Sequence, residues 1–229
     1  MVKVFALLPK KPDISNEQFH RHWREVHAPL ALRISSLRRY VQSHRLPQQI
    51  PGFSSPPYEG VAEVWFDNLE TALRMRKSPE YLEGAFQDEP NFIDTVGLTR
   101  LVTRENVVLA GPEITKDTPG VKGLFLVKRK PGISVAEFQD YWRTRHAPLV
   151  PKTPGLRRYV QCHVLPETYE TATPAYDGVA ELWWPDLATF EKSWASPELQ
   201  IEQLNDARNF VDGRSSAALL VEEVRVIWP

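Results

Sequence analysis

The chain carries the same long sequence pattern twice, and this duplication restricts its fold more than any other feature. The block F-x-x-x-W-R-x-x-H-A-P-L at residues 19–30 returns at residues 138–149, an offset of 119. A second block, G-V-A-E, begins at Gly60 and returns at Gly178, an offset of 118. Each copy is much longer than the roughly 20–50 residues of a solenoid repeat. The sequence therefore predicts two similar domains, a dimer fused into one chain.

The domain limits follow from where the repeat stops. We expect one domain over residues 1–110, a second over residues 120–229, and a linker over residues 111–119. The linker contains glycine and proline and lacks hydrophobic periodicity, as is typical of connections between domains. A length of 229 residues is sufficient for two small domains.

Composition excludes several classes of function. The net charge is −1 and the pI is about 6.6, so we expect neither a nucleic-acid partner nor a membrane surface. Cys162 is the single cysteine, which rules out an internal disulfide and a thiolate zinc cluster. Neither a signal peptide nor a membrane-spanning stretch is recognised, and a cytoplasmic location is expected. Phosphate-binding glycine loops are missing, and the H-x-H at residues 20–22 lacks a third metal ligand, so no cofactor or metal is expected.

Hydrophobic patterning predicts the same element order in both halves: strand, helix, strand, strand, helix, strand. In the first half Ser15 and Gln18 have capping-box spacing, and the helix is expected to end near His27 because Pro29 disfavours a helical residue before it. The expected elements of the first half are 2–8, 15–27, 37–46, 58–66, 68–77 with a piece after Pro79, and 99–109. Those of the second half are 121–127, 135–145, 156–165, 176–184, 187–194 with 199–204, and 217–227.

This order is that of the ferredoxin-like βαββαβ unit. Two helices on one face of a four-stranded sheet leave the other face bare, and two such sheets can cover each other. We therefore predict an α+β fold in which two ferredoxin-like domains pack sheet to sheet as a pseudo-dimeric barrel within one chain. Whether two chains assemble further into a homodimer is left open.

Candidate catalytic side chains lie on alternate positions of the second strand of each half. Alternate residues of a strand share a face, which groups Tyr40 with Gln42 and His44. The next strand carries Glu63, which we expect to lie near His44, where a carboxylate would fix the imidazole tautomer and raise its basicity. The matching residues of the second half are Tyr159, Gln161, His163 and Glu181.

An apolar cavity between sheet and helices is expected to bind a small hydrophobic or aromatic substrate, with the glutamines among the binding residues. Its expected lining is aromatic in both halves: Phe19, Trp23, Tyr40 and Trp65, with Phe138, Trp142, Tyr159 and Trp183. His27 and His146 are further catalytic candidates. The structural alternatives are that Glu63 pairs with an arginine such as Arg39, that the strand histidines bond only a carbonyl, and that His27 and His146 cap helix carbonyls.

The W-R-x-x-H-A-P-L signature, followed by Arg39, Tyr40, Gln42 and His44, resembles the EthD family of the dimeric α/β-barrel superfamily. The resemblance covers residues 1–109 and 120–228 and implies the barrel fold. Fungal EthD-like proteins act as decarboxylases or dehydratases on aromatic polyketides, whereas the bacterial member that gives the family its name is an accessory to an ether-degrading monooxygenase. Most relatives are single-domain homodimers, so the fusion allows the two cavities to differ in function.

Three functions follow as hypotheses. The first is a cofactor-independent lyase or decarboxylase, isomerase or cyclase that uses histidine as acid and base on a small hydrophobic or aromatic compound. The second is a non-catalytic protein that binds a small ligand or serves as an accessory in a degradation pathway. The third is a cofactor-free monooxygenase. The residues do not decide which half is active.

Overall fold

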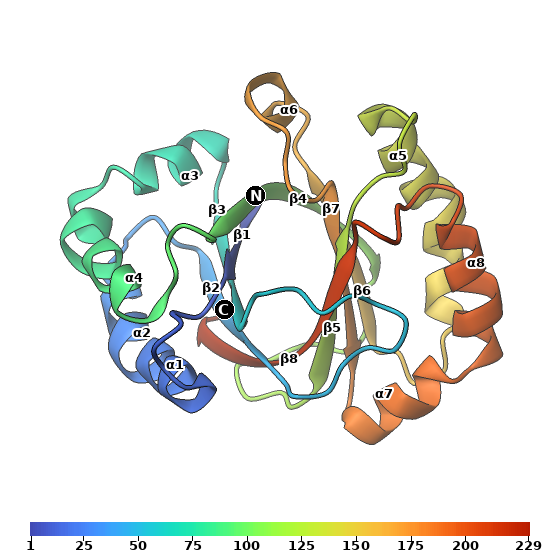
Figure 1. The fold of residues 1–229 in the computed structure, drawn as a ribbon, viewed down its shortest axis with the longest axis horizontal. Helices are drawn as coiled ribbons and strands as arrows, with labels where there is room; N and C mark the ends of the chain where they lie inside the picture. Colours follow the sequence, from blue (N-terminus) through green and yellow to red (C-terminus); the bar gives the residue numbers. More distant parts are fainter. The chain divides into compact units, whose positions relative to one another are not determined.

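The computed structural model describes residues 1–229, and the chain divides into two compact units. Unit 1 contains residues 1–45, 57–102 and 223–229, and unit 2 contains residues 46–56 and 103–222. Both belong to the α+β class, with antiparallel strands and helices on one face of each sheet (Figure 1). The boundary falls inside two long strands, β4 (Thr99–Leu109) and β8 (Ala217–Ile227).

The sheet of unit 1 is built around β3 (Gly60–Phe66), which pairs antiparallel with β1 (Val2–Leu8) and with β2 (Arg39–Arg45). The register places Val41 opposite Glu63 and His44 opposite Gly60. Four α-helices accompany this sheet: α1 (Asn16–His22), α2 (Ala28–Ala31), α3 (Leu69–Met75) and α4 (Phe86–Phe92). A π-helical segment over Tyr81–Ala85 leads directly into α4.

The sheet of unit 2 has the strand order β8-β5-β7-β6-β4, with all neighbours antiparallel. Its central strands are β5 (Val121–Val127), β6 (Arg158–Val164) and β7 (Gly178–Trp184). The helices are α5 (Val135–Tyr141), α6 (Thr168–Thr171), α7 (Leu187–Trp194) and α8 (Leu204–Ala207), with a 3-10 helix over Ala147–Lys152 and a π-helical segment over Glu198–Gln203.

The first long helix of each unit begins at the predicted capping box. Ser15 accepts from the backbone N–H of Gln18, whose side chain accepts from the Ser15 N–H in return. Ser134 and Glu137 form the same pair of bonds in unit 2. Each box satisfies two backbone donors that a helix start otherwise leaves without partners.

The prediction that this helix ends near His27 is wrong. The chain continues through a π-helical turn over Trp23–His27 into α2, and Ala28 keeps helical angles with its N–H bonded to the Trp23 carbonyl. A π-turn shifts the backbone bonds to the i−5 carbonyl and widens the helix locally. That widening accommodates the ring of Pro29, which would otherwise collide with the carbonyl four residues earlier. Unit 2 repeats the turn over Trp142–His146.

Two glycines allow large rings to approach the sheets from the helix side. A Cβ atom at Gly178 would lie 2.6 Å from the Trp142 ring and 2.8 Å from the Cys162 carbonyl oxygen. Gly60 stands equally close to Trp23 in unit 1. Both tryptophans are fully buried, so the repeated G-V-A-E block serves to seat the repeated tryptophan.

Candidate functional site

A buried tryptophan–tyrosine–glutamine cluster joins helix and strand in each unit. In unit 1 the Trp23 Nε1–H donates to the Tyr40 hydroxyl oxygen at 3.0 Å, and Gln42 Nε2 donates to the same oxygen at 3.0 Å. Gln42 Nε2 also donates to the Trp23 carbonyl at 2.8 Å. Because the Tyr40 oxygen accepts two bonds, its own O–H is left to donate elsewhere. Burial raises the pKa of Tyr40 far above its ordinary value, so the hydroxyl stays protonated.

Unit 2 repeats this cluster with nearly the same distances. Trp142 Nε1 donates to the Tyr159 hydroxyl at 2.9 Å, and Gln161 Nε2 donates to it at 3.0 Å. Burial also raises the pKa of Tyr159. The prediction that these strand residues share one buried face is confirmed in both units. The cluster therefore belongs to the common architecture and does not by itself distinguish an active half.

His44 and His163 lie on the same faces, packed against the tryptophans with ring centroids 4.6 Å apart in each case. His44 Nε2 lies 3.1 Å from Gln42 Oε1, and His163 Nε2 lies 3.2 Å from Gln161 Oε1. Burial, followed by the charges of His20 and Arg24, lowers the pKa of His44 to about 3. Burial and Arg143 lower that of His163 to about 3. Both imidazoles are therefore neutral near pH 7.

Only unit 1 extends this histidine into a longer chain of polar contacts. His44 Nδ1 lies 2.9 Å from His20 Nδ1, and His20 Nε2 lies 2.9 Å from Glu59 Oε1. Since Gln42 Oε1 must accept from His44 Nε2–H, His44 Nδ1 accepts from His20 Nδ1–H.

The second unit replaces this chain. Gln139 stands in the place of His20 and donates to the Val164 carbonyl at 2.8 Å. Asp177 stands in the place of Glu59 and contacts Arg129 and Tyr169. His163 Nδ1 is consequently buried without a hydrogen-bond partner. The sequence analysis considered His20 only as a metal ligand and rejected that role, and it did not predict the contact with His44.

His27 and His146 each contact an aspartate from the last helical segment of their unit. His27 Nδ1 lies 3.0 Å from Asp88 Oδ2, and His22 Nε2 lies 2.8 Å from Asp88 Oδ1. Burial alone would raise the pKa of Asp88, but hydrogen bonds from His27, Asn91 and His22 outweigh it and lower the pKa to about 2. The Asp88 carboxylate is thus ionised and orients the His27 imidazole. His27 therefore bonds to an aspartate, whereas the alternative from the sequence was that it caps helix carbonyls.

The pair in unit 2 is His146 Nδ1 with Asp206 Oδ2, at 2.8 Å. Tyr141 replaces His22 and donates to Asp206 at 2.9 Å. Burial lowers the pKa of His146, while the hydrogen bond with Asp206 acts in the opposite direction. Sequence reasoning missed Asp88 and Asp206, although both occupy the same position in the repeat, 118 residues apart.

The prediction that Glu63 lies beside His44 and Glu181 beside His163 is wrong. Each glutamate is on the opposite face of the sheet, because Glu63 pairs in register with Val41 and Glu181 with Val160. Glu63 forms a buried ion pair of 2.8 Å with Lys3 and accepts a 2.5 Å hydrogen bond from Ser43. Glu63 is therefore paired, as one alternative from the sequence expected, but its partner is Lys3 and not an arginine such as Arg39.

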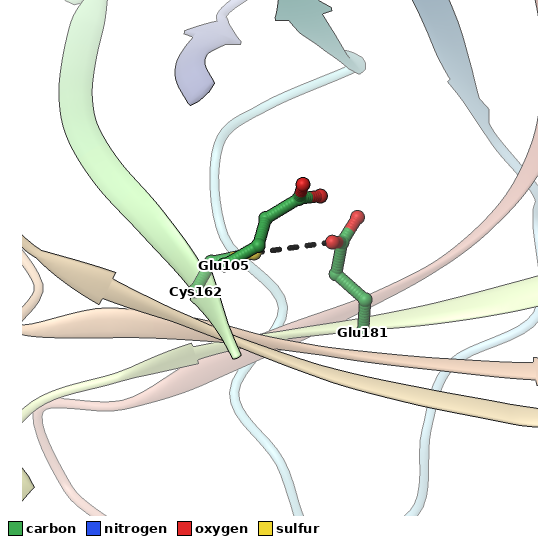
Figure 2. A group of neighbouring side chains, drawn as sticks. All are labelled: Glu105, Cys162 and Glu181. Atoms are coloured by element: carbon green, nitrogen blue, oxygen red, sulfur yellow. Dashed lines mark hydrogen bonds between the residues drawn. The ribbon is translucent and has the colours of Figure 1, made fainter. Parts of the chain in front are cut away.

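The corresponding face of unit 2 gathers Glu105, Cys162 and Glu181, as Figure 2 shows. Cys162 Sγ donates to Glu181 at 3.1 Å, and the potential ligand atoms of all three lie within 4.8 Å of one another. Lys122 Nζ lies 3.4 Å from Glu181 in a fully buried ion pair. An ammonium already supplies positive charge at this point, so the group is poorly suited to a metal ion.

Trp65 and Trp183 also lie on this opposite face. Lys3 Nζ is 4.2 Å from the Trp65 ring centroid, and Lys122 Nζ is 5.1 Å from that of Trp183. Phe19 and Phe138 are fully buried, and each ring packs tilted against the next tryptophan along the chain. None of these four aromatic side chains lines the cavity between sheet and helices in its unit, so the expected lining of that cavity is wrong for them.

Each unit nevertheless holds a cavity between its sheet and its helices. The cavity of unit 1 has a volume of about 170 Å³, and Trp23, His27 and Tyr40 are among its lining residues. The cavity of unit 2 has a volume of about 90 Å³ and is lined by the matching Trp142, His146 and Tyr159. The predicted position of the cavity is confirmed, and in both units the tyrosine and the aspartate-bound histidine face the same space.

A loop residue narrows the second cavity. Phe53, from the segment 46–56 that belongs to unit 2, lines this cavity. Its ring lies 5.2 Å from that of Phe125 and 5.9 Å from that of Trp194. The equivalent loop of the second half, which contains α6, contributes no residue to the lining of the unit 1 cavity. Of the two cavities, only the second therefore has a loop phenylalanine in its lining.

These features define a class of protein: two similar α+β units, each with an aromatic cavity and an aspartate-oriented histidine. The chain belongs to the EthD domain family, whose model matches residues 11–96 and 130–214. None of its helices has the length and apolar character required to cross a bilayer.

Two curated relatives are dehydratases from fungi. Dehydratase aurZ of Gibberella zeae is 29% identical over 121 residues, covering 47% of this chain and 80% of that protein. Dehydratase CTB10 of Cercospora beticola is 31% identical over 98 residues, covering 37% of this chain and 74% of that protein. Among solved structures, an anthrone oxidase-like protein superimposes with a TM-score of 0.66 at 11% identity, covering 98% and 93% of the two chains. This last likeness concerns the fold alone.

Proposed function

We propose that the chain is a dehydratase-type lyase, which eliminates water from a small hydrophobic or aromatic compound bound in the cavity of unit 1. The observation that carries the proposal is the presence of an aspartate-oriented histidine, His27, and a protonated hydroxyl donor, Tyr40, on the wall of one apolar cavity. The names of the two fungal relatives support the same reaction class.

The proposed chemistry assigns a role to each of three residues. His27 Nε2, the ring nitrogen that Asp88 does not hold, removes a proton from the carbon next to a substrate carbonyl. Asp88 stabilises the imidazolium that forms, and the Tyr40 O–H donates to the carbonyl oxygen while negative charge develops there. The carbon–oxygen bond at the neighbouring carbon then breaks, a carbon–carbon double bond forms, and the hydroxide leaves with the proton from His27 as water.

Unit 1 is the better candidate for the active half. Its cavity has nearly twice the volume of the second and contains no phenylalanine from a loop. The second cavity retains His146 and Tyr159 but is partly filled by Phe53. We therefore assign turnover to His27 and treat His146 as a structural counterpart.

A direct assay uses bicyclic β-hydroxy ketones such as 3-hydroxy-1-tetralone, whose dehydration gives 1-naphthol and is followed by its fluorescence. We expect His27→Ala to lower kcat/KM by about 10²–10⁴-fold, the usual contribution of a general base. His146→Ala is the matched control and should retain turnover. Equal activity of His27→Ala and the unmodified protein, or binding of such ketones without any 1-naphthol formed, would contradict the proposal and favour a ligand-binding role.

A further inference from the structure

Four positions around the unit 1 cavity carry polar or charged side chains that the second unit lacks. They come from the end of α3, the π-helical segment, α4 and β4, and none belongs to the acid–base pair described above. The residues are Arg76, Tyr81, Glu89 and Arg100, which align with Trp194, Leu199, Ala207 and Ala218. The two units thus provide an internal comparison of the same fold with and without these charges.

Glu89 is the centre of the group. It is buried, and the Tyr81 hydroxyl donates to Glu89 Oε1 at 2.8 Å. Arg100 Nη2 lies 3.5 Å from Glu89 Oε2, an ion pair longer than a hydrogen bond. Burial and the neighbouring Glu89 raise the pKa of Tyr81 to about 12, so Tyr81 stays a donor. The guanidinium of Arg100 keeps N–H groups that Glu89 does not engage.

The fold does not require this group. At the same positions unit 2 places leucine, alanine and tryptophan, which pack as part of its hydrophobic core. Bringing a carboxylate and a guanidinium into a partly apolar cavity is unfavourable unless other interactions of these groups offset the lost hydration. A ligand that engages the arginines is the simplest reason for unit 1 to retain them.

The balance of charge indicates the sign of that ligand. Two arginines line the cavity against one carboxylate, since Asp88 is already engaged by His22 and His27. Arg76 is exposed and takes no part in the ion pairs of its neighbours Arg74 and Arg100. One positive charge therefore remains at the side of the cavity that reaches solvent.

We propose that the unit 1 cavity binds a ring compound that carries a carboxylate, with the ring among Trp23, Tyr40 and Ala62 and the carboxylate against Arg100 and Arg76. This names the substrate class of the site proposed above and rests on that site being the functional one. A cavity of about 170 Å³ is close in size to the engineered apolar cavity of about 150 Å³ that binds benzene. It is therefore large enough for an aromatic ring, with the charged group at its mouth.

Calorimetric titration with benzoate and with benzyl alcohol tests the proposal, because the two probes share a ring and differ in charge. We expect the unmodified protein to prefer benzoate, and Arg100→Ala, which copies Ala218, to weaken benzoate binding about 10-fold to 100-fold while leaving benzyl alcohol unchanged. Arg21→Ala, at an exposed position of α1 outside the cavity, is the control. Arg100→Gln serves as a second variant if the alanine variant does not fold, as judged by circular dichroism.

Equal binding of the two probes by the unmodified protein, or benzoate binding that survives both Arg100 variants, would overturn the inference. His27→Ala separates it from the proposed reaction. A preference for benzoate that persists in His27→Ala supports the carboxylate site whether or not turnover is ever found. Turnover that depends on His27 without any preference for benzoate would support the dehydratase proposal and contradict the inference that the ligand carries a carboxylate.

Discussion

Acid should destabilise this protein well before its carboxylates are protonated, because two neutral histidines are buried in its sheets. His44 and His163 are each 5% exposed, and the pKa of each is lowered to about 3 from an ordinary value of 6.5. Between these two pKa values the histidines bind protons in the unfolded chain but remain neutral in the folded chain. The stabilisation that comes from keeping them neutral is complete above about pH 6.5 and is lost as the pH falls toward 3.

The size of the effect follows from one pKa unit corresponding to about 1.4 kcal/mol. At about pH 4.5 each histidine lies roughly two units below its unfolded pKa, which costs about 3 kcal/mol per site and on the order of 5 kcal/mol for the pair. Small domains are stable by only about 5–15 kcal/mol, so this loss is a large share of the total. Asp88 adds to the loss only at lower pH, because its carboxylate binds a proton below about 4 in the unfolded chain but only near 2 in the folded protein.

Urea unfolding at about pH 7.5 and about pH 4.5 measures this loss directly. The double variant His44→Gln/His163→Gln removes both titrating groups and keeps a neutral polar side chain at each position. We expect its free energy of unfolding to fall far less across the same interval than that of the unmodified protein. The same pH dependence in both proteins would show that these imidazoles are not the groups excluded from protonation, and the reasoning would fail.

Two further predictions concern the frame that holds the site. Gly178→Ala should lower the free energy of unfolding by about 1–3 kcal/mol, because the added Cβ would lie 2.6 Å from the Trp142 ring. An unchanged melting temperature would contradict this prediction. Ser134→Ala should cost about 1 kcal/mol by removing the capping bond to Glu137, and Ser134→Thr should recover most of the loss, whereas equal stabilities of the two variants would argue against the cap.

Local signals in the sequence were sufficient for the elements of both halves. The capping serines, the apolar runs and the turn residues predict strands and helices within a few residues of those observed, apart from the helix at Pro29. The alternation of Tyr40, Gln42 and His44 on one strand face was equally readable, because a strand has a strict period of two. The failure at Pro29 came from a π-turn, which depends on how the widened helix packs and has no short-range signature here.

Contacts across strands were beyond the sequence. The register of β2 and β3 decides which face Glu63 occupies, and a shift of one residue would have placed it beside His44 as expected. Glu89 and Arg100 are far from Tyr40 along the chain and reach the same cavity only through packing, and Asp88 reaches His27 in the same way. A comparison of the two repeats could have found them: Asp88 is kept as Asp206, whereas Glu89 and Arg100 are replaced by alanines.

The internal repeat and the local patterning were enough to predict two similar halves, the elements of each half and the strand face that carries tyrosine, glutamine and histidine. Periodicity and local propensity encode such features over a few residues. The relative size of the two cavities depends on tertiary packing, and the segment 46–56 is one example, because it brings Phe53 against Phe125 and Trp194 in unit 2. A contact between residues far apart in the chain is fixed by the packing of whole elements, and the sequence does not record it locally.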